Sequence, residues 1–234
     1  AVFGAAALGV VGLRFEESAV HKNPRALQPG TLVRTWWAIL RHPTFVAFAL
    51  LSTASYGGLF TFLAASSFVF IGVLGLSKTE YGLAMFSTAL VYVLGTIWCR
   101  RLLPRFGVRR SVSIAAGLTL GGGLLMGALA WAGLHAVWAL LLPFYLFMFA
   151  HGVHQPCSQS GAVVPFPHAA GAASALSGFL MMIAAFAMGG WLGNHMDGTV
   201  YPLAYGVCFW SVWIAATAWT MVQKHGDPAA PGKL

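Results

Sequence analysis

The spacing of the charged residues constrains this chain more than any other feature of its sequence. Asp, Glu, Lys and Arg are absent from four long stretches, residues 42–77, 81–99, 111–196 and 198–223. A helix needs about 20 apolar residues to cross a bilayer. Three stretches therefore hold one span each, and the longest must fold back twice, near the Gly and Pro residues of 131–135 and 161–168. This pattern predicts six spans, at roughly 44–70, 81–99, 111–132, 137–160, 170–192 and 201–222.

The composition agrees with a membrane protein. Charged residues make up 8% of the 234 residues, hydrophobic residues make up 59%, and the mean hydropathy is +0.77. A soluble domain carries about 25% charged residues. A soluble chain of this length has too little interior for so many apolar side chains, so lipid must solvate them. We therefore exclude a soluble enzyme and a disordered or disulfide-stapled chain, and we expect an all-α integral membrane protein.

The basic residues gather on one side of the predicted bundle. Because the number of spans is even, the segments before span one, between spans two and three and after span six share a face. These segments hold twelve of the 13 Lys and Arg residues, which marks that face as cytoplasmic and explains the net charge of +8 without a nucleic-acid partner. Only Lys78 lies on the opposite face. The twelve are Arg14, Lys22, Arg25, Arg34, Arg41, Arg100, Arg101, Arg105, Arg109, Arg110, Lys224 and Lys233.

The chain is expected to have four parts. Residues 1–13 are uncharged, too short to span a membrane and without an initiator Met or a basic leader. We interpret them as the tail of a preceding transmembrane helix, and the chain as a fragment of a longer protein. Residues 14–41 are expected to form a cytoplasmic linker ending in a short interfacial helix, whose two adjacent tryptophans suit the headgroup region. Residues 42–222 would form the six-helix bundle, and residues 223–234 a cytoplasmic tail.

Polar side chains within spans one and four are the candidate substrate-binding residues. His151 and His154 are three positions apart and so share a helix face, and Gln155 lies one turn from His151. Such residues are costly in a bilayer unless they face the bundle interior or water. They are therefore either hydrogen-bonded packing residues or part of a cavity wall, where a histidine can also titrate. Tyr56 and Phe60 of span one, spaced i and i+4, add two rings that can stack on an aromatic ligand.

The loop between spans two and three holds five arginines around a glycine. Its arginines either only set the orientation of the helices in the membrane or also form a gate. In a gate, the guanidinium groups would cap helix C-termini or pair with acids on a neighbouring segment. The residues of this candidate loop motif are Arg101, Arg105, Gly107, Arg109 and Arg110.

Small residues recur at about every fourth position in spans three and five. Such faces let helix backbones approach closely, so we predict intramolecular packing, which is compatible with sliding during a conformational change. The residues are Gly117, Gly121, Gly123 and Gly127 in span three and Gly171, Ser174 and Gly178 in span five.

The five acids all lie in loops or at span ends. A proton-driven transporter usually needs a carboxylate within the membrane, so that group is expected elsewhere or replaced by a histidine. The sequence has no nucleophile elbow, phosphate loop or zinc-protease motif, and its three cysteines do not pair by spacing. We therefore expect no enzymatic activity, no metal and no cofactor.

One segment resembles a known family. Residues 151–182 resemble the corresponding stretch of the bicyclomycin and chloramphenicol resistance (Bcr/CflA) branch of the major facilitator superfamily. The matching positions are Gly152, Pro156, Ala162, Pro165, Phe166, Ala170, Gly171, Ala173, Ser174, Ala175, Leu176 and Gly178. Looser resemblances lie at 15–18, at 62–70 and at 101–110. Three residues depart from the branch: Ser67 replaces a proline, Cys157 an asparagine, and Pro104 the aspartate of the loop motif.

The resemblance implies the second half of a twelve-span transporter, whose two six-helix halves surround a midplane cavity. It implies export of small hydrophobic or drug-like compounds in exchange for protons, in the bacterial inner membrane. The partners would be the small-molecule substrate, protons, the lipid bilayer and an N-terminal six-helix half that carries the coupling acid. Alternatives are a carrier for another metabolite, such as a nucleoside or sugar, or a membrane scaffold. A haem carrier is disfavoured, because His151 and His154 cannot reach opposite faces of one ring from one helix.

Overall fold

Every regular element of the computed structural model is a helix. The structure describes residues 2–14 and 29–226, and these contain no strand. The prediction of an all-α membrane fold is therefore confirmed. Half of the predicted linker, residues 15–28, lies outside the described part, and so do the last eight residues. The loose family resemblance at residues 15–18 therefore also falls outside it. The chain divides between residues 35 and 36 into two structural units.

From α2 onward, the described helices follow one another with short connections. In chain order they are α1 (Val2–Arg14), α2 (Pro29–Arg41), α3 (Pro43–Ser67), the π-helix η1 (Phe68–Val73), α4 (Lys78–Trp131), α5 (Val137–Val163), the 3-10 helix η2 (Pro167–Ala169), α6 (Ala170–His195), α7 (Tyr201–Trp219) and α8 (Met221–His225). Within the described residues, five helical segments are long and apolar enough to cross a membrane. They are Pro43–Val73, Lys78–Trp131, Val137–Val163, Pro167–His195 and Tyr201–His225.

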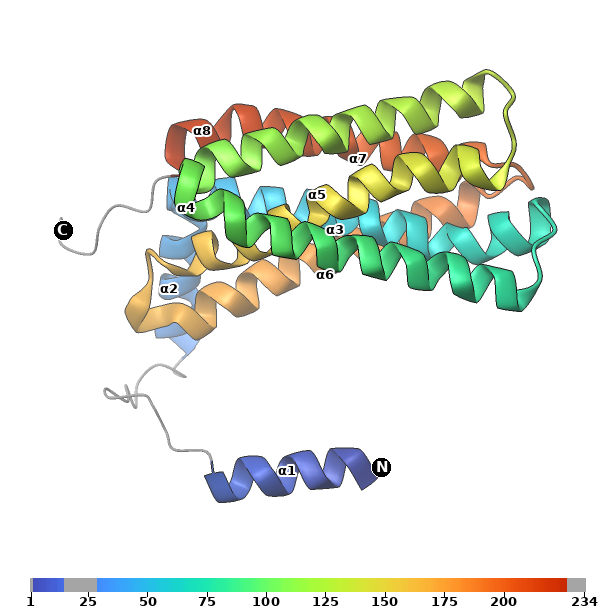
Figure 1. Ribbon diagram of the computed structural model, residues 1–234. Helices are drawn as coiled ribbons and strands as arrows, with labels where there is room; N and C mark the ends of the chain where they lie inside the picture. The colour runs from blue at the N-terminus through green and yellow to red at the C-terminus, as the bar shows by residue number, and fades with distance from the viewer. Residues whose placement is uncertain (1, 15–28, 227–234) are drawn as a thin grey trace. The chain divides into compact units, whose positions relative to one another are not determined.

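The helix α4 is 54 residues long because it contains two of the predicted spans. Its helical geometry breaks at Gly107, where φ is 68° and ψ is 177°. Only glycine adopts such a conformation without strain. The helix reverses there, so that the limbs 78–106 and 108–131 run in opposite directions, shown green and yellow-green in Figure 1. The hydroxyl of Ser111 donates to the Gly107 carbonyl at 2.6 Å, which ties the second limb to the turn.

The start of α4 has a capping box. The Ser77 hydroxyl accepts a hydrogen bond from the Glu80 amide at 3.2 Å, and the Ser77 amide donates to the Glu80 carboxylate at 2.8 Å. These bonds satisfy amide groups that would otherwise lack partners at a helix N-terminus. They also fix the point at which the chain enters the helix after η1.

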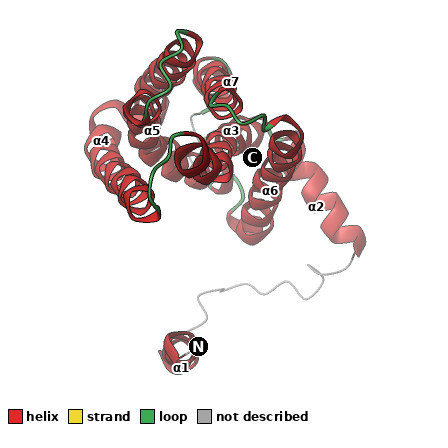
Figure 2. Cartoon of the chain, turned by 90° about the vertical axis from the view of Figure 1, so that its right-hand side faces the viewer, coloured by secondary structure: helices red, strands yellow, loops and turns green. Residues whose placement is uncertain are grey.

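A central helix and a cluster of aromatic rings hold the bundle together. Figure 2 looks along the bundle, in which α3 contacts α5, α6 and α7. The rings of Phe62 and Phe144 stack with centroids 3.4 Å apart, and Phe147 stacks on Phe144 at 5.5 Å. In the candidate spans, 39–61% of the most apolar window is buried within the protein. The remaining apolar side chains face outward, as expected where lipid is the solvent.

Several glycines let the helices touch backbone to backbone. A Cβ atom on Gly152 of α5 would lie 2.6 Å from the amide nitrogen of Thr96 on α4, and one on Gly95 would overlap the Phe149 carbonyl. On the second limb, a Cβ on Gly122 would lie 2.6 Å from the Pro143 carbonyl of α5. One on Gly123 would overlap Ser211 of α7. Glycine therefore sets the distance between α4 and its two neighbours.

The predicted small-residue faces are only partly correct. Gly123 and Gly127 contact α7, whereas Gly117 and Gly121 have nothing within 4 Å of an added Cβ. The same holds for Gly171 and Gly178 on α6, and Ser174 is exposed. These five positions therefore do not pack against other helices of the described bundle. The reason is geometric: a four-residue spacing identifies one helix face but does not say what that face meets.

Two cysteines that are far apart in sequence meet between α4 and α5. The sulfur atoms of Cys99 and Cys157 lie 3.8 Å apart, and both side chains are buried. Sequence spacing did not reveal this pair, because the contact depends on how the two helices pack. Cys208 of α7 lies beside Gly127, which belongs to the second limb of α4.

The predicted interfacial segment is helical. It corresponds to α2, where Trp36 and Trp37 are exposed and Ile39 is buried. The guanidinium of Arg41 lies 4.5 Å from the centre of the Trp37 ring, in a cation–π contact. Location at the membrane surface stays a prediction for this helix.

Candidate substrate cavity

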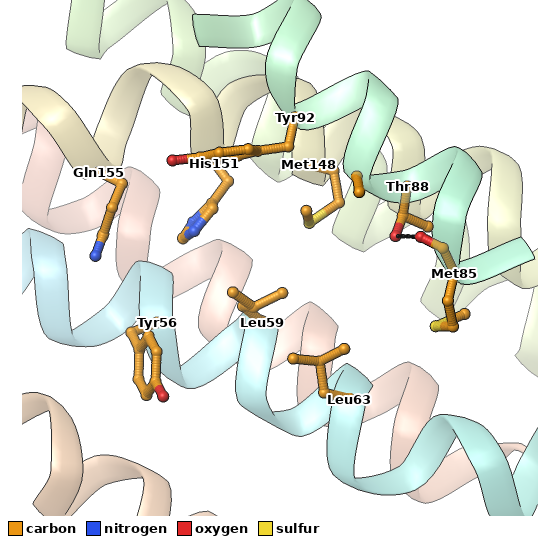
Figure 3. Close-up of a pocket in the computed structure, with 10 residues that line it drawn as sticks. Tyr56, Leu59, Leu63, Met85, Thr88, Tyr92, Met148, His151 and Gln155 are labelled. Carbon is orange, nitrogen blue, oxygen red and sulfur yellow. Dashed lines mark hydrogen bonds between the residues drawn. The ribbon is translucent and has the colours of Figure 1, made fainter. Parts of the chain in front are cut away.

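A cavity of about 410 Å³ lies between α3, the first limb of α4 and α5 (Figure 3). Its volume falls within the range of small-molecule binding sites, roughly 300–1,000 Å³. Ten residues line it: Tyr56, Leu59 and Leu63 from α3, Met85, Thr88, Ala89 and Tyr92 from α4, and Met148, His151 and Gln155 from α5.

The cavity wall is mainly apolar and carries no Asp, Glu, Lys or Arg among its ten residues. Thr88 uses its hydroxyl locally, since it donates to the Met85 carbonyl at 2.7 Å. The polar groups left for a ligand belong to two tyrosines, one imidazole and one amide. Such a wall suits a compound that is largely hydrophobic and has one or two hydrogen-bonding groups.

His151 is held by α3 although it belongs to α5. Its Nδ1 lies 2.7 Å from the Ser55 hydroxyl, and its ring packs 5.6 Å from the Tyr92 ring and 6.2 Å from the Phe147 ring, measured between centroids. The side chain is 4% exposed. Figure 3 shows its imidazole extending from α5 toward α3. These contacts fix the ring at the edge of the cavity.

Gln155 has an unsatisfied atom at the cavity. Its side-chain oxygen is buried and has no hydrogen-bond partner in the protein. A buried acceptor without a partner costs about 1–3 kcal/mol. Figure 3 shows the amide pointing from α5 into the space above Tyr56. Turning this amide about its last side-chain bond would bring the oxygen toward the cavity, where a ligand with an N–H or O–H group would satisfy it.

His154 does not line the cavity. It is fully buried, and its Nε2 lies 3.1 Å from the Thr119 hydroxyl on the second limb of α4. The sequence predicts that His151 and His154 share a face, but the two rings contact different helices. Three residues rotate a helix by about 300°, so the rings are separated by about 60° around the axis. In a tight bundle this angle is enough to direct them to different neighbours.

Phe60 also lies outside the lining. Its ring stacks on Tyr56 with centroids 6.5 Å apart, as the i, i+4 spacing suggests. It faces α6, where an added Cβ on Gly189 would lie 3.7 Å from it. Phe60 therefore packs against Tyr56 without lining the cavity, and of the two rings only Tyr56 lines it.

Sequence reasoning missed the contribution of α4 to the cavity. Met85, Thr88 and Tyr92 follow one another at i, i+3 and i+7 and so line one face of the first limb. Thr88 and Tyr92 are polar residues within an apolar span, and this polarity is the sequence feature that could have identified them as cavity residues. The leucines and methionines of the wall gave none, because their side chains are equally suited to lipid.

The arginine segment is a helix reversal. Arg101, Arg105 and Arg110 are exposed, and Arg109 is half-buried. The carbonyl of Arg109 accepts a hydrogen bond from Gln223 of α8 at 3.0 Å, which connects the turn to α8. Gly107 supplies the turn itself. A gating role for the guanidinium groups stays a prediction.

Comparison with known proteins gives a consistent result. The family model of the major facilitator superfamily matches residues 1–190. Multidrug resistance protein D of Escherichia coli K12 is 32% identical over 152 residues, which cover 65% of this chain and 38% of that protein. A bicyclomycin resistance protein homolog of Haemophilus influenzae is 22% identical over 209 residues, covering 88% and 52%.

An uncharacterized MFS-type transporter of Bacillus subtilis, YdgK, is 25% identical over 182 residues, covering 74% of this chain and 43% of that protein. The chain thus spans about half the length, or less, of the curated relatives it matches. No solved structure matches it.

Proposed function

Because this chain belongs to the major facilitator superfamily and is a multi-pass membrane transporter, we propose that it forms the carboxyl-terminal half of a multidrug exporter. In this proposal the exporter moves small hydrophobic or drug-like compounds out of the cell in exchange for protons. The observation that carries the proposal is the cavity between α3, α4 and α5, whose mainly apolar wall includes four polar groups available to a ligand, those of Tyr56, Tyr92, His151 and Gln155.

The wall composition favours drug-like compounds over sugars. A sugar needs a hydrogen-bonding partner for nearly every hydroxyl, because each polar group buried without one costs free energy. Met85, Met148 and the cavity leucines offer flexible apolar surface, which adapts to ligands of different shape. The names of two relatives, multidrug resistance protein D and bicyclomycin resistance protein homolog, support the same substrate class.

Transport would occur by alternating access. The described bundle would rock against an N-terminal half of similar size, so that the cavity opens to one side of the membrane at a time. The greater length of the relatives supports such a partner half. The charge distribution supports a cytoplasmic location for the turn at Gly107 and for the chain's end, in a bacterial inner membrane.

The test is expression of the full-length protein in a bacterial host that lacks its own drug pumps. We expect lower accumulation of hydrophobic drugs, and a loss of this effect when the proton gradient is collapsed. Tyr56→Ala and Gln155→Leu should each alter the range of compounds exported. Leu142→Ala, on an exposed position of α5, is the matched control and should leave that range unchanged. Unaltered accumulation of every compound by the wild-type protein would refute the proposal.

A further inference from the structure

His151 differs in kind from the other residues of the cavity wall. It is the one histidine among the ten, and histidine is the residue type whose ordinary pKa lies nearest to physiological pH. The amide, threonine hydroxyl and thioether groups of the wall do not titrate. Protonation of His151 would therefore place a single positive charge in a wall that otherwise carries none.

The partner of His151 suits both protonation states. A hydroxyl donates and accepts hydrogen bonds, so Ser55 can donate to Nδ1 of the neutral ring or accept from Nδ1–H of the protonated ring. Ser55 is itself fully buried, which keeps the pair from exchanging with solvent on the α3 side. The ring can thus change charge without losing its position.

Few other groups compete for a proton at this site. On α4, Tyr92 faces the His151 ring, and on α3, Ser55 and Tyr56 do so. On α5 the nearest titratable group is His154, whose Nε2 is engaged by Thr119. Glu80 and Asp197, the acids of the described residues, sit beyond helix ends or in their first turn. A charge on His151 would therefore act on the ligand rather than on a neighbouring acid.

We propose that His151 is the proton-coupling residue within this bundle, and that a proton and the exported compound compete for the same cavity. This inference rests on the proposed function. Binding of a compound from the cytoplasm would displace one proton from the imidazole. After the compound leaves on the opposite side, the imidazole would take up one proton there and return it to the cytoplasm. One proton would thus enter for each compound exported, and no covalent step is needed.

The experiment uses the purified full-length protein and two substitutions matched to the hydrogen bonds. Asn places a polar atom where Nδ1 of histidine lies, so His151→Asn keeps the contact with Ser55. Gln does the same for Nε2, so His154→Gln keeps the contact with Thr119 and is the control. The probe is ethidium, a fluorescent hydrophobic cation. Its binding is measured in detergent at pH 5.5–8.5, and its gradient-driven transport and gradient-free exchange are measured in proteoliposomes.

The wild-type protein and His154→Gln should bind ethidium roughly five-fold or more weakly at pH 5.5 than at pH 8, because a protonated imidazole repels the cation. His151→Asn should bind it equally at both pH values. This variant should also lose gradient-driven transport and retain ethidium exchange. A pH-dependent affinity and normal gradient-driven transport in His151→Asn would overturn the inference.

Failure of the inference and failure of the proposed function give different results. If the wild-type protein neither binds nor transports drugs, the proposed function fails. If it transports with a proton gradient and His151→Asn does the same, only the coupling role fails.

Should His151→Asn not fold, Ser55→Ala is the variant to test instead. Its binding profile should move to lower pH, since Nδ1–H of the protonated ring loses its acceptor, and Ser55→Thr should restore it. An unmoved profile in Ser55→Ala would count against the role of His151.

Discussion

At the scale of single residues, the unpaired oxygen of Gln155 predicts which ligands depend on it. Gln155→Leu should weaken binding of compounds with a hydrogen-bond donor by about ten-fold, equivalent to roughly 1.4 kcal/mol. Purely apolar compounds should bind as before or better. Gln159→Leu is the control, because Gln159 lies one turn further along α5 and donates to Met181 rather than to the cavity. Competition binding in detergent measures both. Equal losses for the two ligand classes would contradict the assignment.

The capping box at the start of α4 predicts a pH dependence of stability. Hydrogen bonds from the side chain and backbone of Ser77 hold the pKa of Glu80 below its usual value of 4.5. A depressed folded pKa means that the carboxylate stabilises the folded state above pH 4.5, and that this stabilisation is lost as the pH falls through the lower folded value. Glu80→Gln should therefore lower the melting temperature at pH 7 more than at pH 3.

Thermal unfolding of the purified protein at the two pH values checks this effect, which should be small because Glu80 is exposed. Ser77→Ala combined with Glu80→Gln should cost little more than either change alone, since the two residues act on each other. Fully additive losses would mean that the capping box is not the source.

Polarity decides how much of the site a sequence can reveal. Tyr56, His151 and Gln155 stand out as polar groups in apolar helices, and all three line the cavity. His154 is polar in the same way, and Phe60 has a ring spaced i, i+4 from Tyr56, yet each turns toward a neighbouring helix. The direction of a side chain depends on which helices flank its own, and that arrangement is a property of the packed bundle. Residues such as Leu59 and Met148 carry no signal at all.

At the scale of helices, the contact between α4 and α5 predicts a sharp dependence on residue size. Gly152→Ala would force a methyl group against the backbone of Tyr92, Gly95 and Thr96. The helices must then separate, at a cost of about 1–3 kcal/mol. Gly121→Ala is the matched control, since nothing lies near that position. Chemical unfolding in detergent should show a clear loss for the first variant and little change for the second. Equal stability would show that the helices do not touch here.

The same contact predicts a cross-link. With sulfur atoms 3.8 Å apart, Cys99 and Cys157 should form a disulfide when the full-length protein is treated with diamide, a membrane-permeant oxidant that takes up the two electrons and two protons released. Mass spectrometry of proteolytic peptides detects the bond. Cys208 should stay unpaired. Failure of the pair to form under conditions that oxidise an exposed cysteine would argue against this packing of α4 on α5.

The stretches without charged residues predict the positions of the helices, but they do not predict the structure of the junctions between helices. The structure has helices over all six predicted ranges, with small differences at their ends. The first range continues past residue 70 as a π-helix that ends at Val73. No local sequence pattern predicts this extension. The segment expected as an arginine loop proves to be helical on both sides of Gly107, because one glycine suffices to reverse the chain.

At the scale of the whole molecule, the distribution of charge predicts the topology. Thr79 and Arg105 are exposed at opposite ends of the first limb of α4. In the full-length protein with its native cysteines replaced, Thr79→Cys should react with a membrane-impermeant maleimide added to intact cells. Arg105→Cys should react only after the membrane is permeabilised. The reverse result would invert the bundle and refute the proposed cytoplasmic location of the turn.

The one-residue reversal at Gly107 also has a mechanical consequence. A turn without spare residues fixes the rotational phase of the second limb relative to the first, since each residue of a helix turns it by about 100°. The first limb carries Tyr92 at the cavity, and the second carries Gly123 against α7. Only the φ and ψ angles of Gly107 are then available to absorb a rotation of the first limb about its own axis. Any part of the rotation that these two angles do not absorb would reach the contact between α4 and α7, on the far side of the bundle from Tyr92.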